Sequence, residues 1–253
     1  MIINNATIGF IAAENLKINN EVTLYARFSN SCYFQCENGE FIMLADKKYG
    51  PVSFAISVDN PLDVLNQLPE VGSELVLNVN GDIWIPTHMA TIRNENPNSL
   101  TMLKQNLRSF DDIFHNKIFV LKADIIKAAK AEDYDKTISL FTGFLGLGQG
   151  LTPSADDWTF AFFYTLKCTK RKTYADKVCQ ALSDIAKPLT SFASYAYLSS
   201  LKTDNGIECI NNLLNAYENA PSNLQVCCQV LSMVGSSSGQ DMLWGIYDAL
   251  LLE

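Results

Sequence analysis

Histidine is scarce in this chain, and long apolar segments are missing. The 253 residues include two histidines, His88 and His115, neither of which lies in a glycine- or serine-rich motif. A Ser-His-Asp or Cys-His catalytic arrangement would therefore need a histidine from elsewhere in the fold. No apolar run reaches the roughly 18 residues that span a membrane, and the N-terminus lacks the pattern of a signal peptide. We expect no membrane partner and a cytoplasmic location.

Charged residues are also few, at 18% of the chain, and the net charge is −8. This balance argues against a nucleic-acid partner, because neutralising phosphates needs clustered lysine and arginine. The basic cluster at residues 167–172 lies near the expected end of a helix, where cations complement the helix dipole. The seven cysteines follow no disulfide or zinc spacing, which fits a reduced, cytoplasmic protein.

The first hundred residues are typical of β-structure. Segments 22–28 and 51–58 are rich in β-branched and aromatic residues or alternate as strands do. Asn-Gly pairs at 38–39 and 80–81 each lie between apolar runs, which predicts two hairpins with type I′ turns. Together these features predict an antiparallel β-barrel or sandwich-like unit over residues 1–97.

From about residue 98 apolar residues recur at three- and four-residue spacing, which indicates helices. The predicted helices lie near residues 99–109, 112–131, 134–144, 154–170, 173–187, 191–202, 206–219, 222–234 and 238–252. We expect an α+β protein in which the β-rich N-terminal unit is followed by a larger all-helical unit over residues 98–253.

The stretch GFLGLGQGLTPSADD at residues 143–157 is the most informative motif. Glycines let the backbone approach a ligand closely, and a helix N-terminus presents unpaired N–H groups to an anion. The motif lacks the Lys-Ser/Thr ending of a Walker A loop and the spacing of a dinucleotide-binding loop. It therefore favours a small anion over ATP or NAD.

A second stretch, GSSSGQD at residues 235–241, also precedes an apolar helix. In both stretches a serine stands three positions before an aspartate, so Ser154 with Asp157 and Ser238 with Asp241 fit a capping box. Capping does not require the glycines, the Thr-Pro step or Asp156. We therefore expect the two helix N-termini to converge on a polar pocket.

The candidate catalytic residues are Asp156, Asp157 and Asp241, and the candidate substrate-binding residues are Gly148, Gly150, Thr152, Ser154, Ser191, Ser237, Ser238 and Gly239. The three aspartates leave a Mg²⁺ site open, and no other cofactor is indicated. Aspartates are poor bases unless their pKa is raised, so positioning and electrostatic stabilisation of a charged substrate suit this set best.

The stretch GLGQGLTPSADD resembles GLGPGLTPSGDD, the hallmark of a bacterial family that includes the AllH-type subunit of oxamate carbamoyltransferase. Segments 50–56, 190–198 and 235–246 are similar to other landmarks of that family. The resemblance implies a component of an enzyme that converts oxalurate and phosphate into oxamate and carbamoyl phosphate with the help of other subunits. Ala155 replaces the family's usual glycine, and we expect its Cβ to crowd a ligand that approaches this backbone.

Two functions remain open. The first is a carbamoyltransferase-like component that binds a small carboxylate or acyl-phosphate anion at the glycine- and serine-rich helix N-termini. The second is a non-catalytic partner that docks onto other carbamoyltransferase subunits and shapes their active site, with Phe162, Phe163 and Tyr164 as candidate exposed aromatics. Both imply a hetero-oligomer. A metal-dependent hydrolase that uses the aspartates is a third, weaker hypothesis.

Overall fold

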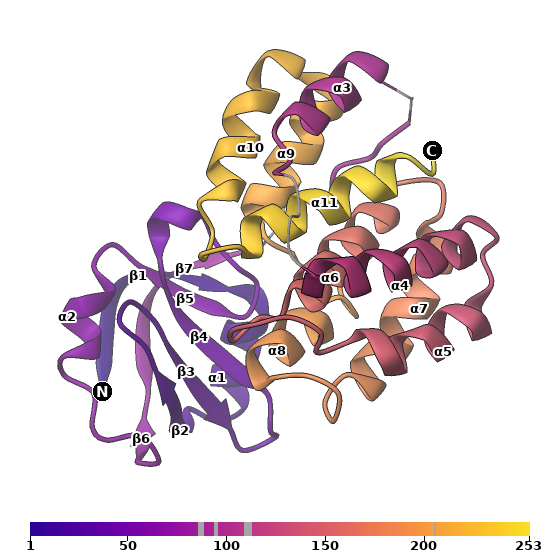
Figure 1. Ribbon diagram of the computed structural model, residues 1–253. Coiled ribbons are helices and arrows are strands. Elements are labelled where there is room, and N and C mark those ends of the chain that lie inside the picture. Colours follow the sequence, from indigo (N-terminus) through magenta and orange to yellow (C-terminus); the bar gives the residue numbers. More distant parts are fainter. Residues whose placement is uncertain (86–88, 94–95, 109–112, 205) are drawn as a thin grey trace. The chain divides into compact units, whose positions relative to one another are not determined.

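The computed structural model describes residues 1–85, 89–93, 96–108, 113–204 and 206–253, without the side chains of residues 113–117. The chain forms two compact units, Met1–His88 with Asp204–Cys209 and Met89–Thr203 with Ile210–Glu253, and each is described by itself (Figure 1). The predicted boundary at residues 97 and 98 stays a prediction. His88 and the side chain of His115 lie outside the description. Within the described ranges, no helix is long and apolar enough to cross a membrane.

The first unit is built on a curled sheet of seven strands in the order β6-β2-β3-β4-β5-β1-β7. The strands are β1 (Ile2–Gly9), β2 (Glu21–Arg27), β3 (Cys32–Cys36), β4 (Phe41–Asp46), β5 (Ala55–Val58), β6 (Glu74–Val76) and β7 (Asn78–Trp84). Helices α1 (Phe10–Ile18) and α2 (Pro61–Leu65) and the 3-10 turn η1 (Lys47–Tyr49) complete the unit. The α+β class is confirmed. The sheet is mixed and not purely antiparallel, because β1 pairs with β7 and β4 with β5 in parallel.

The predicted hairpin at Asn38-Gly39 is confirmed, but its turn type was wrong. Strands β3 and β4 pair in antiparallel fashion on either side of it. Gly39 has a φ of 81°, whereas Asn38 does not adopt the positive φ that a type I′ turn needs. The Gly39 N–H donates to Cys36 O and the Cys36 N–H donates to Glu40 O, both at 2.9 Å. This is the three-residue loop with a left-handed glycine bulge.

The second predicted hairpin, at Asn80-Gly81, was wrong because this pair lies inside the continuous strand β7. Strand β1 carries a bulge opposite it, where the pairing passes from Ile3 with Val79 to Ala6 with Gly81. A Cβ at Gly81 would lie 1.9 Å from the carbonyl oxygen of Ala6. The glycine therefore permits a close backbone approach at a bulge, which is the other common reason for glycine in a strand.

The second unit contains all nine predicted helices, with ends that differ by a few residues. They are α3 (Pro97–Gln105), α4 (Ile113–Lys130), α5 (Tyr134–Phe144), α6 (Ser154–Lys167), α7 (Lys172–Ile185), α8 (Phe192–Ser200), α9 (Glu208–Asn219, which begins in the first unit), α10 (Leu224–Ser232, after the 3-10 turn η2, Pro221–Asn223) and α11 (Ser238–Leu250). Every residue of α6 is buried, so this helix is the centre of the unit. Phe162, Phe163 and Tyr164 are at most 1% exposed, and the expectation of exposed aromatics there was wrong.

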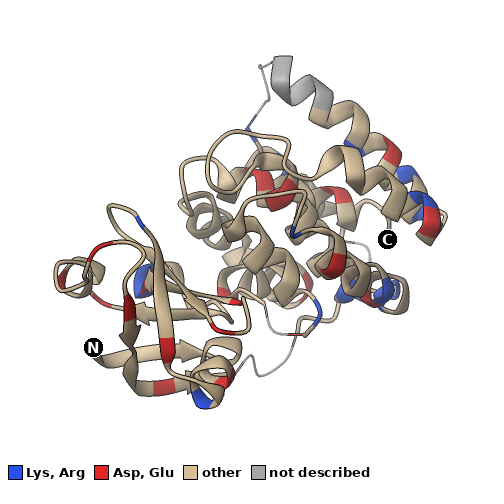
Figure 2. Cartoon of the chain, turned by 90° about the horizontal axis from the view of Figure 1, so that it is seen from below, with Lys and Arg blue, Asp and Glu red and all other residues tan. Residues whose placement is uncertain are grey.

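The basic residues at and after the end of α6 are engaged within the second unit. The ammonium of Lys167 is buried and donates to the carbonyl oxygens of Leu201 and Thr203 at 2.8 and 2.9 Å. Arg171 forms ion pairs with Glu132 and Glu253. Figure 2 shows that most of the chain consists of uncharged residues, with charged residues scattered among them. This cluster thus serves the packing of its own unit.

Helix α11 packs directly against α6 through Gly245. A Cβ built on Gly245 would lie 2.5 Å from the carbonyl oxygen of Trp158 and 2.9 Å from the amide nitrogen of Phe162. Both are backbone atoms that cannot move aside cheaply. We expect Gly245→Ala to lower the free energy of unfolding by about 1–3 kcal/mol, as overpacking does.

The matched control is Gly143→Ala in α5, where an added Cβ would meet no atom within 4 Å. Alanine is the better helix former, so this variant should be neutral or more stable by up to about 1 kcal/mol. Urea denaturation of the full-length variants measures both effects. Equal stabilities for the two variants would contradict the close packing of α11 on α6.

Candidate active site

The two motif loops meet in space, as the sequence predicted. The hydroxyls of Thr152 and Ser238 are 2.8 Å apart, which joins the loop before α6 to the start of α11. These residues are 86 positions apart in the chain. The hydrogen bond therefore places the N-termini of α6 and α11 next to each other.

Three consecutive main-chain N–H groups at each of these N-termini are already bonded to carbonyl groups of the chain itself. The Ala155 N–H donates to Leu147 O at 2.9 Å, and the next two N–H groups donate to Pro153 O. At α11, the Gly239 N–H donates to Val234 O at 2.9 Å, and the next two donate to Ser237 O. An anion would therefore find these donors engaged, and binding would rest on side chains.

The capping boxes predicted from the sequence were wrong. Pro153 and Ser237 occupy the N-cap positions, and within the described residues neither makes a side-chain capping bond. Ser154 and Ser238 are the first residues of their helices. Their hydroxyls are thus available for contacts other than capping.

Gly148 permits the tight backbone turn of the first loop. Gly148 has a φ of 140°, and a Cβ there would lie 2.2 Å from the Ser154 nitrogen. Gly239 in the second motif approaches Leu231 O, where a Cβ would lie 1.9 Å away, while Gly150 has open space around it. Ala155 is fully buried, so the crowding expected of its Cβ falls inside the unit and not at a ligand-facing surface.

Asp156 and Ser191 fasten the loops to each other. The Asp156 carboxylate accepts hydrogen bonds from the Gly146 N–H, at 2.8 Å, and from the Thr190 hydroxyl. Burial raises the pKa of Asp156, and these two hydrogen bonds oppose the shift. Ser191 caps α8 by accepting from the Ser194 N–H, and its hydroxyl donates to Leu151 O. Both residues thus have full structural roles.

Asp157 and Asp241 are the other two candidate acids, and both are nearly inaccessible, at 3% and 2% exposure. Burial raises the pKa of Asp157 well above its ordinary range, and the charge of Asp241 adds to that rise, whereas the hydroxyls of Ser238 and Thr152 lower it. Asp157 Oδ2 has no hydrogen-bond partner among the residues that the structure describes. A proton held by Asp157 relieves the cost of burying this second charge.

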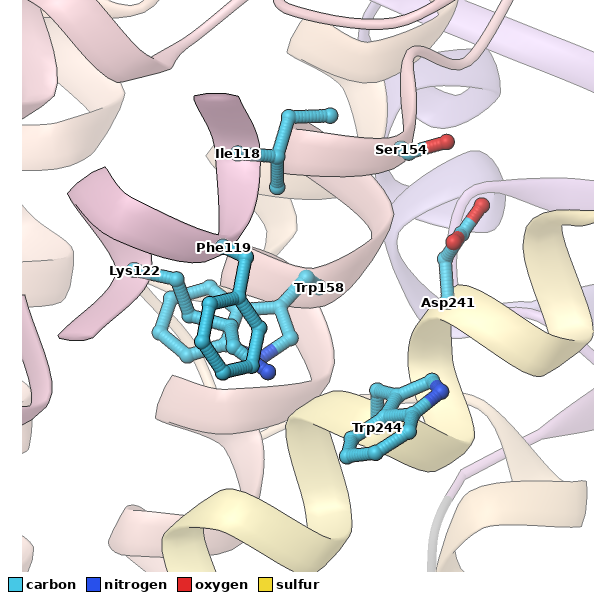
Figure 3. A pocket seen from close by; sticks show the side chains of 7 residues that line it. All are labelled: Ile118, Phe119, Lys122, Ser154, Trp158, Asp241 and Trp244. Carbon is cyan, nitrogen blue, oxygen red and sulfur yellow. The ribbon is translucent and has the colours of Figure 1, made fainter. Parts of the chain in front are cut away.

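A pocket lies between α4, α6 and α11, beside the converging N-termini (Figure 3). It is partly open to solvent and is lined by Ile118, Phe119, Lys122, Ser154, Trp158, Asp241 and Trp244. Ser154 and Asp241 form one end, where the Asp241 carboxylate points toward Ser154. Lys122 and the aromatic rings form the other part.

A buried ion pair supports the aromatic end of the pocket. The Lys122 ammonium lies 2.7 Å from Asp248 Oδ2, and both side chains are less than 10% exposed. The same oxygen accepts a hydrogen bond from Trp158 Nε1 at 2.8 Å. Lys122 Nζ also lies 4.6 Å from the ring centroid of Trp244 and 5.2 Å from that of Phe119. These contacts fix the cation against aromatic faces.

The option of a Mg²⁺ site at Asp156, Asp157 and Asp241 finds no support in the geometry. Among the described residues, no three histidine, cysteine, aspartate or glutamate side chains form a group that could hold a metal ion. Asp156 already accepts two hydrogen bonds from its neighbours.

Comparison with known families adds a second observation. The model of the family described as oxamate carbamoyltransferase subunit AllH matches residues 144–250. Over this segment the chain is similar to the AllH family. The matched segment contains both motif loops, α6 and α11, whereas Lys122 and the rest of α4 lie outside it. No solved structure gives a significant match.

The sequence prediction missed Lys122, Trp158, Trp244 and Asp248. A signal existed for the tryptophans, because Trp158 follows Ser154 by four positions and Trp244 follows Asp241 by three. Such spacings place each pair on one helix face. Lys122 and Asp248 carry no comparable signal, because their pairing depends on how α4 and α11 pack.

The raised pKa of Asp157 has a testable sign. A carboxyl whose pKa is higher in the folded state stabilises the protein below its unfolded pKa of about 3.9, and this contribution is lost as the pH rises toward the folded value. We expect the stability of the wild type relative to Asp157→Asn to fall as the pH rises above about 4. Urea denaturation of both proteins from pH 4 to 8 measures this difference.

The control is Asp124→Asn, which alters an exposed aspartate of α4. Its stability relative to the wild type should vary little over the same pH range. A wild-type advantage over Asp157→Asn that grows with pH would show that Asp157 is stabilised as a carboxylate and would contradict this account.

Proposed function

We propose that this protein is a subunit of an oxamate carbamoyltransferase and that its helical unit binds a small carboxylate substrate beside the N-termini of α6 and α11. The family match over residues 144–250 supports the class of enzyme. The observation that carries the proposal is the hydrogen bond between Thr152 and Ser238, because it brings both motif loops to one end of a pocket.

The geometry favours side chains over main-chain N–H groups as the binding groups. Ser154, Asp241 and Lys122 are the polar residues that line the pocket, and the main-chain donors behind them are engaged. In the proposed reaction, the bond between the carbamoyl carbon and the amide nitrogen of oxalurate breaks, and a phosphate oxygen bonds to that carbon. The departing oxamate nitrogen takes up a proton. In this proposal Asp241 accepts a hydrogen bond from an N–H group of the substrate.

A second candidate function is that of a partner that shapes the active site of other oxamate carbamoyltransferase subunits. One face of α10 favours it. Val226, Val230 and Met233 follow one another at helical spacing and are 60%, 39% and 66% exposed. The sequence of α10, LQVCCQVLS, contains no charged residue. Such a face fits burial against another subunit of the enzyme better than contact with water.

Reconstitution with the other subunits of the enzyme separates the two candidates. The measurement is the formation of carbamoyl phosphate from oxalurate and phosphate, together with the mass of the assembly. We expect Asp241→Asn to assemble normally and to lower the rate by at least about tenfold, since a hydrogen bond to a charged group is lost. Asp124→Asn is the matched control and should keep full activity.

Val230→Lys tests the second candidate, because it introduces a charge into the apolar face of α10. Full activity of Asp241→Asn together with failed assembly of Val230→Lys would favour the non-catalytic partner. Full activity and assembly of both variants would contradict both candidates.

A further inference from the structure

We propose that Lys122 determines which ligand the pocket accepts, by donating to the carboxylate end of a small planar amide whose NH₂ end faces Ser154 and Asp241. This inference rests on the proposed function and adds the orientation of the ligand and the residues that recognise each end. Lys122 lies outside the segment that the family model matches.

The ion pair between Lys122 and Asp248 does not by itself identify a stabilising role for Lys122. Removing two charges from water costs about as much free energy as their attraction returns, so a buried ion pair is weak evidence of a stabilising role. Here the pair with Asp248 lies at the wall of a pocket, with Trp158 donating to the same carboxylate oxygen. An ammonium has three N–H donors, and the bond to Asp248 uses one of them.

The opposite end of the pocket has the complementary chemistry. Asp241 is buried at this end. A carboxylate can accept hydrogen bonds, and so can the hydroxyl of Ser154. An NH₂ group supplies two donors for these acceptors. A second carboxylate at this end would face the charge of Asp241 and be repelled.

Aromatic rings line the part of the pocket that contains Lys122. Trp244 comes from α11, Phe119 from α4 and Trp158 from α6, and all three line the pocket (Figure 3). Flat ring faces suit a flat ligand. A compact, planar molecule with one carboxylate and one amide therefore matches the pocket in charge and in shape.

Three molecules of nearly equal size and shape test this orientation. Oxamate has one carboxylate and one amide, oxamide has two amides, and oxalate has two carboxylates. Titration calorimetry of the full-length protein with each should rank oxamate first. Oxamide lacks the charge that Lys122 holds, and oxalate brings a second charge toward Asp241.

The decisive variant is Lys122→Met combined with Asp248→Asn, which removes the cation without leaving an unpaired buried carboxylate. We expect it to bind oxamate about 10–100-fold more weakly than the wild type, with little change for oxamide, since a hydrogen bond to a charged group is lost. Lys127→Met, which alters an exposed lysine of the same helix, is the matched control and should bind as the wild type does.

A second variant tests the other end. Asp241→Asn should bind oxalate more tightly than the wild type, because the repelling charge is gone. Unchanged oxamate affinity in the double variant overturns the role of Lys122. Binding of none of the three molecules by the wild type overturns the pocket as a ligand site, whereas activity in the reconstituted enzyme would still uphold the proposed function.

Discussion

The contact between α6 and α11 is the constraint on which the helical unit depends. Gly245 lets the backbones of the two helices approach until a single added methyl group would strike the Trp158 carbonyl. That approach brings the two N-termini together, and the Thr152–Ser238 hydrogen bond joins their loops. The pocket lies beside this contact because α4 covers the same helices with Phe119 and Lys122. The site is thus a consequence of helix packing.

The motif residues divide into those that build the loops and those that face the pocket. Asp156, Gly148 and Ser191 hold the loops in shape through hydrogen bonds and close backbone contacts. Ser154 and Asp241 line the pocket, whereas Asp157 is buried behind with a raised pKa. A conspicuous motif can therefore be largely a device for placing a few side chains.

The sequence predicted the α+β class, the nine helices and the meeting of the two loops, because periodicity and turn residues are local signals. The sequence-based prediction failed where contacts between distant residues determine the structure. Asn80-Gly81 has the signature of a hairpin but serves a bulge, since β7 pairs with the distant strand β1. The Lys122–Asp248 pair joins residues 126 positions apart (248 − 122) on helices α4 and α11, and neither residue belongs to one of the motifs. No sequence pattern indicated that carbonyl groups of the loops accept hydrogen bonds from the N–H groups at the two helix N-termini.

The central claim is that the pocket between α4, α6 and α11 binds a small amide carboxylate in one orientation. A crystal structure of the protein soaked with oxamate tests it most directly. The account predicts oxamate in this pocket, with a carboxylate oxygen within hydrogen-bonding distance of Lys122 Nζ and the amide nitrogen facing Asp241 and Ser154. Oxamate bound elsewhere on the protein, or bound here with its carboxylate toward Asp241, would contradict the account.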